Sequence, residues 1–283
     1  MTTRMRTWIL LAGLSALFVA VGGLVGGTSG IVLFLLIAVG FNFAMFWFSD
    51  RLALKMSRAR PLEPGEARDL VADVEDLAQR ARIPVPRLYL IPSQQPNAFA
   101  TGRSPKHSAV AVTEGLLALM PRDQVRGVIA HELAHIRNRD VLVTTIAAMI
   151  GAAISAVAHF LQFQWLFGGD DDDSPLGLVG TLAAVLIAPI AAMLLQFAVS
   201  RQREFLADAT AAELLGTGRP LADALGTLQR GVEVLPMEVN PASASLYIVN
   251  PLTGGGMASL FSTHPPIPAR IERLQAFDAQ RGL

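Results

Sequence analysis

The chain has 283 residues, of which 52% are hydrophobic and 16% are charged, whereas roughly a quarter of the residues in soluble globular domains are charged. Lys and Arg together number 23, as do Asp and Glu, so the net charge is zero and no overall basic field recruits nucleic acid. Cysteine is absent, which excludes disulfides, thiolate nucleophiles and cysteine-ligated metals. The composition favours a membrane protein, in which any metal must be held by His, Asp or Glu.

The N-terminal part of the chain predicts two membrane-spanning helices. Residues 7–49 carry no charged side chain, and this run is about twice the roughly 20 residues that a helix needs to cross a bilayer. A cluster of Gly, Thr and Ser at 26–30 supplies a turn near its middle. We therefore expect one span near 7–25 and another near 31–48.

Two further charge-free runs, 141–169 and 174–200, predict a second hairpin with the acidic cluster 170–173 at its tip. Four such runs would be hard to bury in a soluble protein. Lys and Arg flank every expected span on the same side and are absent from both tips, so both termini and both polar segments are expected in the cytoplasm. The expected order is a hairpin at 1–50, a cytoplasmic part at 51–140, a hairpin at 141–200 and a cytoplasmic part at 201–283.

The first polar segment predicts helices and a small β-sheet. Residues 64–82 place Leu and Val at helical spacing and predict an amphipathic helix, which Pro84 and Pro86 end. Thr113 then precedes an expected helix at 114–120. Short runs rich in β formers or small residues predict the strands of the sheet at 87–91, 98–101 and 108–112.

Two expected helices continue into or out of the membrane. From Pro121 the pattern stays helical through the third span, and from the fourth span the helical pattern continues to about Leu215. Residues 236–268 are rich in Pro, Gly, Ser and Asn and predict irregular structure, and a last short helix is expected from Pro268 to about Ala279. The predicted fold is mainly α, with a small β-sheet and four transmembrane helices.

His131, Glu132 and His135 match the pattern H-E-x-x-H. Two histidines one helical turn apart can hold one metal ion while the glutamate projects towards a water molecule. Random placement gives roughly 0.003 expected matches in such a chain. The pattern thus predicts a metal site, with zinc as the expected ion. Apolar residues around it form a face suited to a packed helix: Val125, Val128, Ile129, Leu133 and Ala134.

A catalytic zinc ion usually takes three protein ligands and leaves one position open. Glu204 follows the fourth span directly, at the membrane level that His135 occupies before the third, so geometry favours Glu204 as the third ligand. Asp208, four residues later on the same helix face, could accept a hydrogen bond from a ligand imidazole and fix its tautomer. The remaining candidates are His107 in a polar loop, His159 deep in the third span, and His264.

The motif and its surroundings resemble the HtpX family of membrane metalloproteases over nearly the whole chain. The sequence Ile-Arg-Asn-Arg-Asp follows the two histidines at 136–140, and Arg-Glu-Phe-Leu-Ala-Asp follows the fourth span at 203–208. The segments 97–102, 250–252 and 262–266 also match the family. The order of two spans, a catalytic helix and two more spans completes the resemblance.

The resemblance implies a zincin-like core with one zinc ion held by His131, His135 and Glu204. It also implies a bacterial inner-membrane enzyme of the stress response that acts on damaged or misfolded membrane proteins. Asn97, Ala98 and Phe99 would face the substrate, and we expect this segment to be an exposed strand edge beside the zinc. Such an edge can hold an extended polypeptide through main-chain hydrogen bonds.

His264 and Arg270 resemble a His-Pro and downstream Arg pair of the wider superfamily, which would stabilise the oxyanion formed when water attacks the peptide bond. Preorganised donors of this kind can contribute several kcal/mol to catalysis. In the alternative interpretation, His264 caps a turn and Arg270 pairs with a nearby acid such as Glu272 or Asp278.

In the expected mechanism Glu132 takes a proton from the attacking water and later delivers it to the leaving amine. The expected partners are the lipid bilayer and polypeptide substrates, with no nucleic acid, and the oligomeric state is left open. One alternative is a protease for prenylated peptides, which would share every catalytic residue. Another is a non-enzymatic membrane scaffold or transporter with a metal site, which would not require Glu132.

Overall fold

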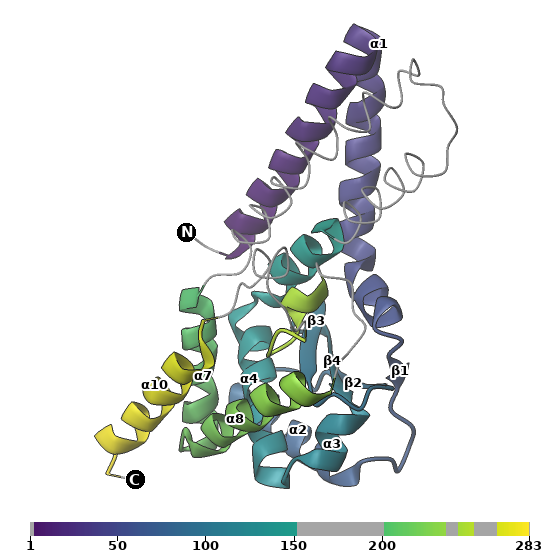
Figure 1. The fold of residues 1–283 in the computed structure, drawn as a ribbon. Helices are drawn as coiled ribbons and strands as arrows, with labels where there is room; N and C mark the ends of the chain where they lie inside the picture. The colour runs from purple at the N-terminus through teal and green to yellow at the C-terminus, as the bar shows by residue number, and fades with distance from the viewer. Residues whose placement is uncertain (1–2, 152–200, 236–242, 252–264, 283) are drawn as a thin grey trace.

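The computed structural model describes residues 3–151, 201–235, 243–251 and 265–282 (Figure 1). Most of the expected second hairpin, including its tip at 170–173 and His159, lies outside the described residues, as does His264. Within the described part, a helical hairpin rises from a domain that contains a small sheet and several helices (Figure 1).

The hairpin is formed by α1 (Thr3–Met56), which consists of two helical arms joined at Gly26 and Gly27. Gly27 has a φ of 55°, a conformation that glycine adopts at little cost. Asn42 on the second arm donates hydrogen bonds to the Leu11 carbonyl at 3.2 Å and to Ser15 Oγ at 2.7 Å on the first. The two arms therefore pack antiparallel, with the turn in the expected glycine cluster.

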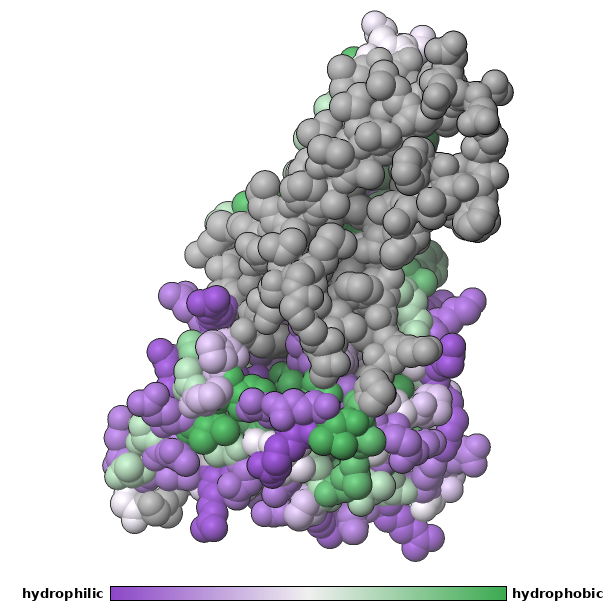
Figure 2. Space-filling view, viewed as in Figure 1, coloured by the Kyte–Doolittle hydropathy of each residue, from purple (hydrophilic) through white to green (hydrophobic). Residues whose placement is uncertain are grey.

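Of the described residues, one helix, Gly26–Met56, is long and apolar enough to cross a membrane, and Thr7–Ala20 and Val141–Gly151 are shorter apolar helices. Most of the exposed large hydrophobic side chains lie on α1. Hydrophilic side chains, in contrast, cover much of the lower domain in Figure 2. The described residues thus contain one of the four expected spans at full length.

The sheet has four strands in the order β1-β2-β4-β3, where β1 is Arg60–Pro61, β2 is Arg87–Ile91, β3 is Ala98–Ser104 and β4 is His107–Thr113. The three strands expected from the sequence are present, and the two-residue β1 is an addition. β2 runs parallel to β4, whereas β3 is antiparallel to β4 and forms an edge. A bulge follows Gly102, whose φ is 144°. The edge strand β3 lies beside the helix α4 (Arg122–Asn138).

The described helices after α1 confirm most of the expected elements. They are α2 (Arg68–Ala81), α3 (Glu114–Leu119), α4 (Arg122–Asn138), α7 (Arg201–Leu215), α8 (Arg219–Val234), the short 3-10 helix η1 (Ser243–Leu246) and α10 (Ile267–Gln280). Thr113 caps α3 through a side-chain oxygen that accepts a hydrogen bond from the Leu116 amide. The helix α8 is not among the sequence predictions.

The helix α4 is the centre of the domain and packs against α2, α7, α8 and β3 (Figure 1). Its side chains Val128, Ile129, Leu133 and Ile136 are completely buried in the main core. Because neighbours surround it on several sides, α4 is held in one position and orientation.

The expectation that α4 continues into the third span is wrong. α4 ends at Asn138, and Arg139 takes a left-handed conformation with a φ of 59°. The Arg139 amide donates to the Ile136 carbonyl and the Asp140 amide to the His135 carbonyl, which closes the helix end. A separate apolar helix then begins at Val141.

Gly127 allows α4 to approach the start of α8 closely. A Cβ atom at this position would lie 2.7 Å from the Leu221 amide nitrogen and from the Pro220 carbonyl carbon. Both are backbone atoms, so an added methyl group would push the two helices apart. Gly226 on α8 is a matched control, because a Cβ there would meet only the flexible end of Arg230 at 3.6 Å.

We predict that Gly127→Ala destabilises the protein by about 1–3 kcal/mol through overpacking. Gly226→Ala should be neutral or stabilising by up to about 1 kcal/mol, since alanine favours the helix. Thermal unfolding midpoints of the two variants in detergent check the prediction. A midpoint for Gly127→Ala that equals or exceeds that of the unmodified protein would contradict it.

Candidate metal centre

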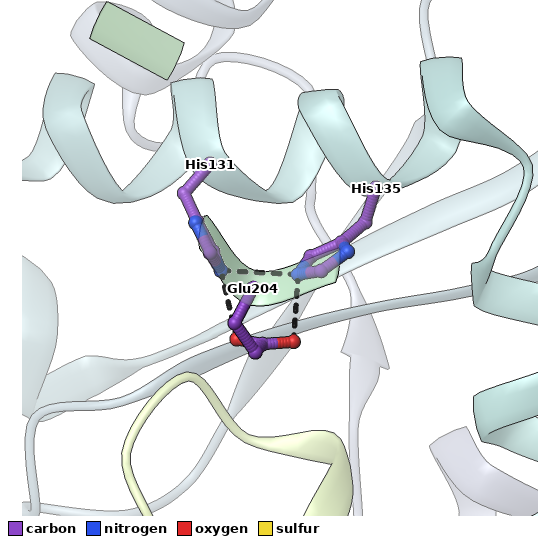
Figure 3. A group of neighbouring side chains, drawn as sticks. All are labelled: His131, His135 and Glu204. Carbon is purple, nitrogen blue, oxygen red and sulfur yellow. Dashed lines mark hydrogen bonds and ion pairs between the residues drawn. The ribbon is translucent and has the colours of Figure 1, made fainter. Parts of the chain in front are cut away.

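His131, His135 and Glu204 converge from two helices (Figure 3). The histidines lie one turn apart on α4, and Glu204 lies in the first turn of α7, which packs along α4. The two Nε2 atoms are 3.0 Å apart. Glu204 Oε2 is 3.7 Å from His131 Nε2, and Oε1 is 3.5 Å from His135 Nε2.

These distances suit a single small cation. Zinc binds imidazole nitrogen and carboxylate oxygen at roughly 2.0–2.2 Å in tetrahedral geometry, which separates neighbouring ligand atoms by roughly 3.3–3.5 Å. The observed separations of 3.0, 3.5 and 3.7 Å bracket that value. Three ligands of this kind leave a fourth position for a reacting molecule.

Asp208 contacts the Nδ1 atom of His131, and Arg270 in turn forms an ion pair with Asp208. Asp208 Oδ1 lies 3.0 Å from His131 Nδ1. The fully buried Arg270 guanidinium donates to both oxygens of Asp208, at 2.9 and 2.7 Å, and to the Ile248 carbonyl at 3.2 Å. Burial raises the pKa of Asp208, but Arg270 and His131 outweigh burial and bring it to about 2. The carboxylate is therefore charged and available to accept the imidazole N–H.

Asp140 holds the His135 ring in the corresponding way. Both of its carboxylate oxygens lie 3.1 Å from His135 Nδ1, and the residue is buried. Burial lowers the pKa of His135, but the charges of Asp140 and then Glu204 raise it to about 10. In the metal-free ring Asp140 accepts the proton on Nδ1, and the second proton, on the Nε2 atom that faces Glu204, is the one that a bound metal ion would replace. Asp140 is absent from the site predicted from the sequence.

Glu132 lies between the two histidines in the sequence, is buried, and accepts a hydrogen bond from the backbone amide of Ala100 on β3. Burial raises the pKa of Glu132 to about 7, with the nearby Glu204 also raising it. A carboxyl group with a pKa near neutrality can both accept and release a proton. Burial lowers the pKa of His131 to about 4, so this imidazole is neutral, as a metal ligand requires.

The expectation of an exposed edge at 97–102 is wrong in part. β3 is an edge strand beside the metal centre, but Asn97, Ala98 and Phe99 are buried. The Ile248 amide donates to the Ala98 carbonyl at 3.1 Å, and the Asn97 side chain donates to the Val249 carbonyl at 2.9 Å. The segment after η1 thus covers the start of this strand.

The remaining candidates from the sequence are Arg270, His107 and His264. Arg270 pairs with Asp208, and neither Glu272 nor Asp278 is its partner. Asp278 instead accepts hydrogen bonds from Thr217 and from the Gly218 amide. His107 is exposed, and its Nδ1 atom shares a hydrogen bond with Ser104 Oγ at 3.1 Å. His264 lies outside the described residues.

A helix with the H-E-x-x-H spacing that meets a glutamate from a second helix defines a metallopeptidase active site. The chain belongs to peptidase family M48, whose model matches residues 64–278. The matched region contains β2, β3 and β4, α4, α7 and Arg270, and therefore every described residue of the metal centre.

Proteins named "Protease HtpX homolog" are similar to nearly the whole chain. The protein from Pelotomaculum thermopropionicum is 51% identical and is aligned over 96% of this chain and 98% of its own. The protein from Desulfatibacillum aliphaticivorans is 47% identical, and the alignment covers 100% of this chain and 92% of that protein. The protein from Thermococcus kodakarensis is 47% identical, and the alignment covers 99% of this chain and 97% of that protein. The resemblance to the HtpX family is thereby confirmed.

A solved structure, the crystal structure of Ste24p from S. mikatae, has a similar fold, with a TM-score of 0.52 and 22% identity. The alignment covers 96% of this chain and 65% of Ste24p. At this identity the similarity concerns the fold alone, and it extends to the chain as a whole.

We predict that Asp140→Asn lowers the affinity for the metal by roughly 10- to 100-fold, the range typical of partners that orient a ligand histidine. The amide can still accept a hydrogen bond but no longer supplies the negative charge. Zinc content after titration with a competing chelator measures the effect. Asp123→Asn, which changes an exposed acid in the first turn of α4, is the control; equal affinities for the two variants would remove Asp140 from the centre.

Proposed function

We propose that this metallopeptidase is a zinc-dependent endopeptidase of the bacterial inner membrane that cleaves damaged or misfolded membrane proteins on the cytoplasmic side. The observation that carries the proposal is the convergence of His131, His135 and Glu204 beside the buried Glu132. Membership of the HtpX family, which the sequence resemblance associates with membranes, and the apolar hairpin support the setting in a membrane.

The donor set favours zinc. Two imidazole nitrogens and one carboxylate are typical of catalytic zinc sites, and the separations of their atoms suit tetrahedral coordination. The carboxylates around the centre are Glu132, Glu204, Asp208 and Asp140. Arg270 forms ion pairs with Asp208 at 2.7 Å and with Glu204 at 4.0 Å. A divalent cation would offset much of this buried negative charge.

In the mechanism that we propose, bound zinc would supply Lewis-acid polarisation of the scissile carbonyl. Glu132 accepts the proton of the attacking water and then delivers it to the leaving amine. The Ala100 amide fixes the orientation of the Glu132 carboxylate. Asp208 and Asp140 keep protons on the two Nδ1 atoms, so that both Nε2 atoms remain available as ligands.

We propose that substrates extend along β3, with Asn97, Ala98 and Phe99 forming one end of the binding edge. The Ala98 carbonyl accepts a hydrogen bond from the Ile248 amide. A substrate that hydrogen-bonds to this carbonyl must therefore displace the Ile248 amide. The Asn97 side chain would act indirectly by holding the segment that contains Val249. His264 remains a proposed oxyanion donor, whereas the contacts of Arg270 favour a positioning role behind His131.

We predict that Glu132→Gln retains the metal but lowers peptide hydrolysis by at least about 100-fold, because the amide keeps the size of the side chain and cannot accept the proton. Metal analysis and digestion of an unfolded polypeptide by the protein purified in detergent test both parts. Glu75→Gln, an exposed change on α2, should leave cleavage unchanged. Substantial cleavage by Glu132→Gln would end the assigned role.

We predict that an impermeant thiol reagent labels Thr28→Cys or Asp171→Cys from outside intact spheroplasts but labels Glu75→Cys only after the membrane is opened. Thr28 is exposed at the tip of the first hairpin, position 171 is in the expected second tip, and Glu75 is exposed on α2. Since the chain has no cysteine, each variant carries a single label site. The opposite pattern would place the active site outside the cell.

A further inference from the structure

A second site lies where the base of the hairpin meets the domain. A cavity of about 1090 Å³ is bounded by both arms of α1, by the end of α2 and residues 82–84, by the end of β3 and the turn that follows it, and by four residues around the end of α4, namely Arg137, Arg139, Val141 and Leu142. None of the proposed metal ligands lines it. It is therefore separate from the metal centre.

All ionisable side chains that line this cavity are cationic. Arg80 forms an ion pair with Asp76 at 3.1 Å. The others have no ion pair with any carboxylate in the part of the chain that the structure describes. They are Arg82, Arg103, Lys106, Arg137 and Arg139. Uncompensated cations around one hollow raise the local concentration of anions and offer donors to them.

The cavity also has an apolar lining, most of which comes from the hairpin. Trp8, Leu11 and Phe46 line it together with Leu142. Trp8 is 65% exposed and Trp47, at the same end of the hairpin, is 40% exposed. Tryptophans in such positions are typical of the boundary between lipid and water.

The β3–β4 turn lies at the same level. The guanidinium carbon of Arg103 is 4.6 Å from the centre of the Trp47 ring, a geometry favourable for a cation–π interaction. The cationic wall thus meets the hairpin at the height of these tryptophans. A ligand that fits both walls has an anionic head and an apolar body.

We infer that this cavity binds the phosphate headgroup of an anionic phospholipid. The headgroup contacts Arg103, Lys106 and Arg82, and the acyl chains lie against Trp8, Leu11 and Phe46. Basic pockets at the cytoplasmic end of membrane helices bind anionic lipids by this combination of charge and apolar contact. The inference rests on the proposed insertion of the hairpin into a membrane. A free phosphate ion would contact the Arg and Lys side chains of the cavity but not its apolar residues.

The test is lipid binding by the full chain, purified in a zwitterionic detergent and carrying Glu132→Gln so that peptidase activity has no influence. Phosphatidylglycerol is the probe, and phosphatidylcholine and glycerol 3-phosphate are the comparison ligands. The variant is Arg103→Gln with Lys106→Gln. The control is Arg51→Gln with Lys55→Gln, which removes the same charge near the end of α1 from exposed positions outside the cavity.

We expect phosphatidylglycerol to bind more tightly than either comparison ligand, and the cavity variant to bind it at least about tenfold more weakly. The control should bind it as the unmodified chain does. Lys106→Gln alone, an exposed change, should give a smaller loss and serves if the double variant unfolds. Equal losses in the cavity variant and the control would overturn the inference, as would equal affinity for glycerol 3-phosphate.

Two parallel measurements separate this inference from the proposed function. Extraction of the chain from membranes by salt or alkali without detergent would contradict the membrane insertion itself. Cleavage of an unfolded polypeptide by Lys106→Gln with Glu132 restored reports on the peptidase, because Lys106 lies in the turn after β3 and outside the proposed substrate edge. Retained cleavage with weakened lipid binding is the result that we expect.

Discussion

The buried ion pair between Arg270 and Asp208 ties the metal centre to the rest of the domain. Arg270 comes from α10, Asp208 from α7, and the imidazole that Asp208 contacts comes from α4. Removing one partner of a buried pair typically costs about 3–5 kcal/mol, because the other charge is left uncompensated. The position of His131 therefore depends on the correct packing of three helices from the middle and the C-terminal part of the chain.

The helix α4 supports the same centre through its burial. Its core side chains are closed in by α2, α7, α8 and β3, so neither histidine can turn away without disturbing a packed interior. Glu132 is fixed on its other side by the amide of Ala100. The base, the ligands and their supporting carboxylates thus have positions set by rigid elements, as preorganised catalysis requires.

The parts of the site that could be predicted from the sequence depend on local geometry. The spacing of His131 and His135 places both on one helix face whatever the rest of the chain does, and Asp208 follows Glu204 at the same spacing. Asp140 has no such spacing relative to His135, because the chain leaves the helix between them at Arg139. The cover of β3 by 247–249 depends on contacts across about 150 positions of sequence, as in the Asn97–Val249 hydrogen bond, which no periodicity reports.

Helix α8 is a different kind of omission, since its signal is present in the sequence. Leu221, Leu225, Leu228 and Val232 have helical spacing and are buried, and Pro220 suits a helix start. The strands were predictable because runs of β formers bounded by Pro, Gly and Ser are local features. Their order in the sheet, with β3 at the edge, is a property of tertiary packing and not of any single run.

The turn at Arg139 joins the two sites of the molecule. Its left-handed conformation ends α4 and directs the Asp140 carboxylate back to His135 Nδ1. Arg139 lines the cationic cavity together with Arg137 from the last turn of α4, and the apolar helix Val141–Gly151 begins just after it. A continuous helix would carry Asp140 away from His135, because positions five apart do not share a helix face. The break that contradicts the simple helical pattern is therefore what allows one short segment to orient a metal ligand and to line the cationic cavity.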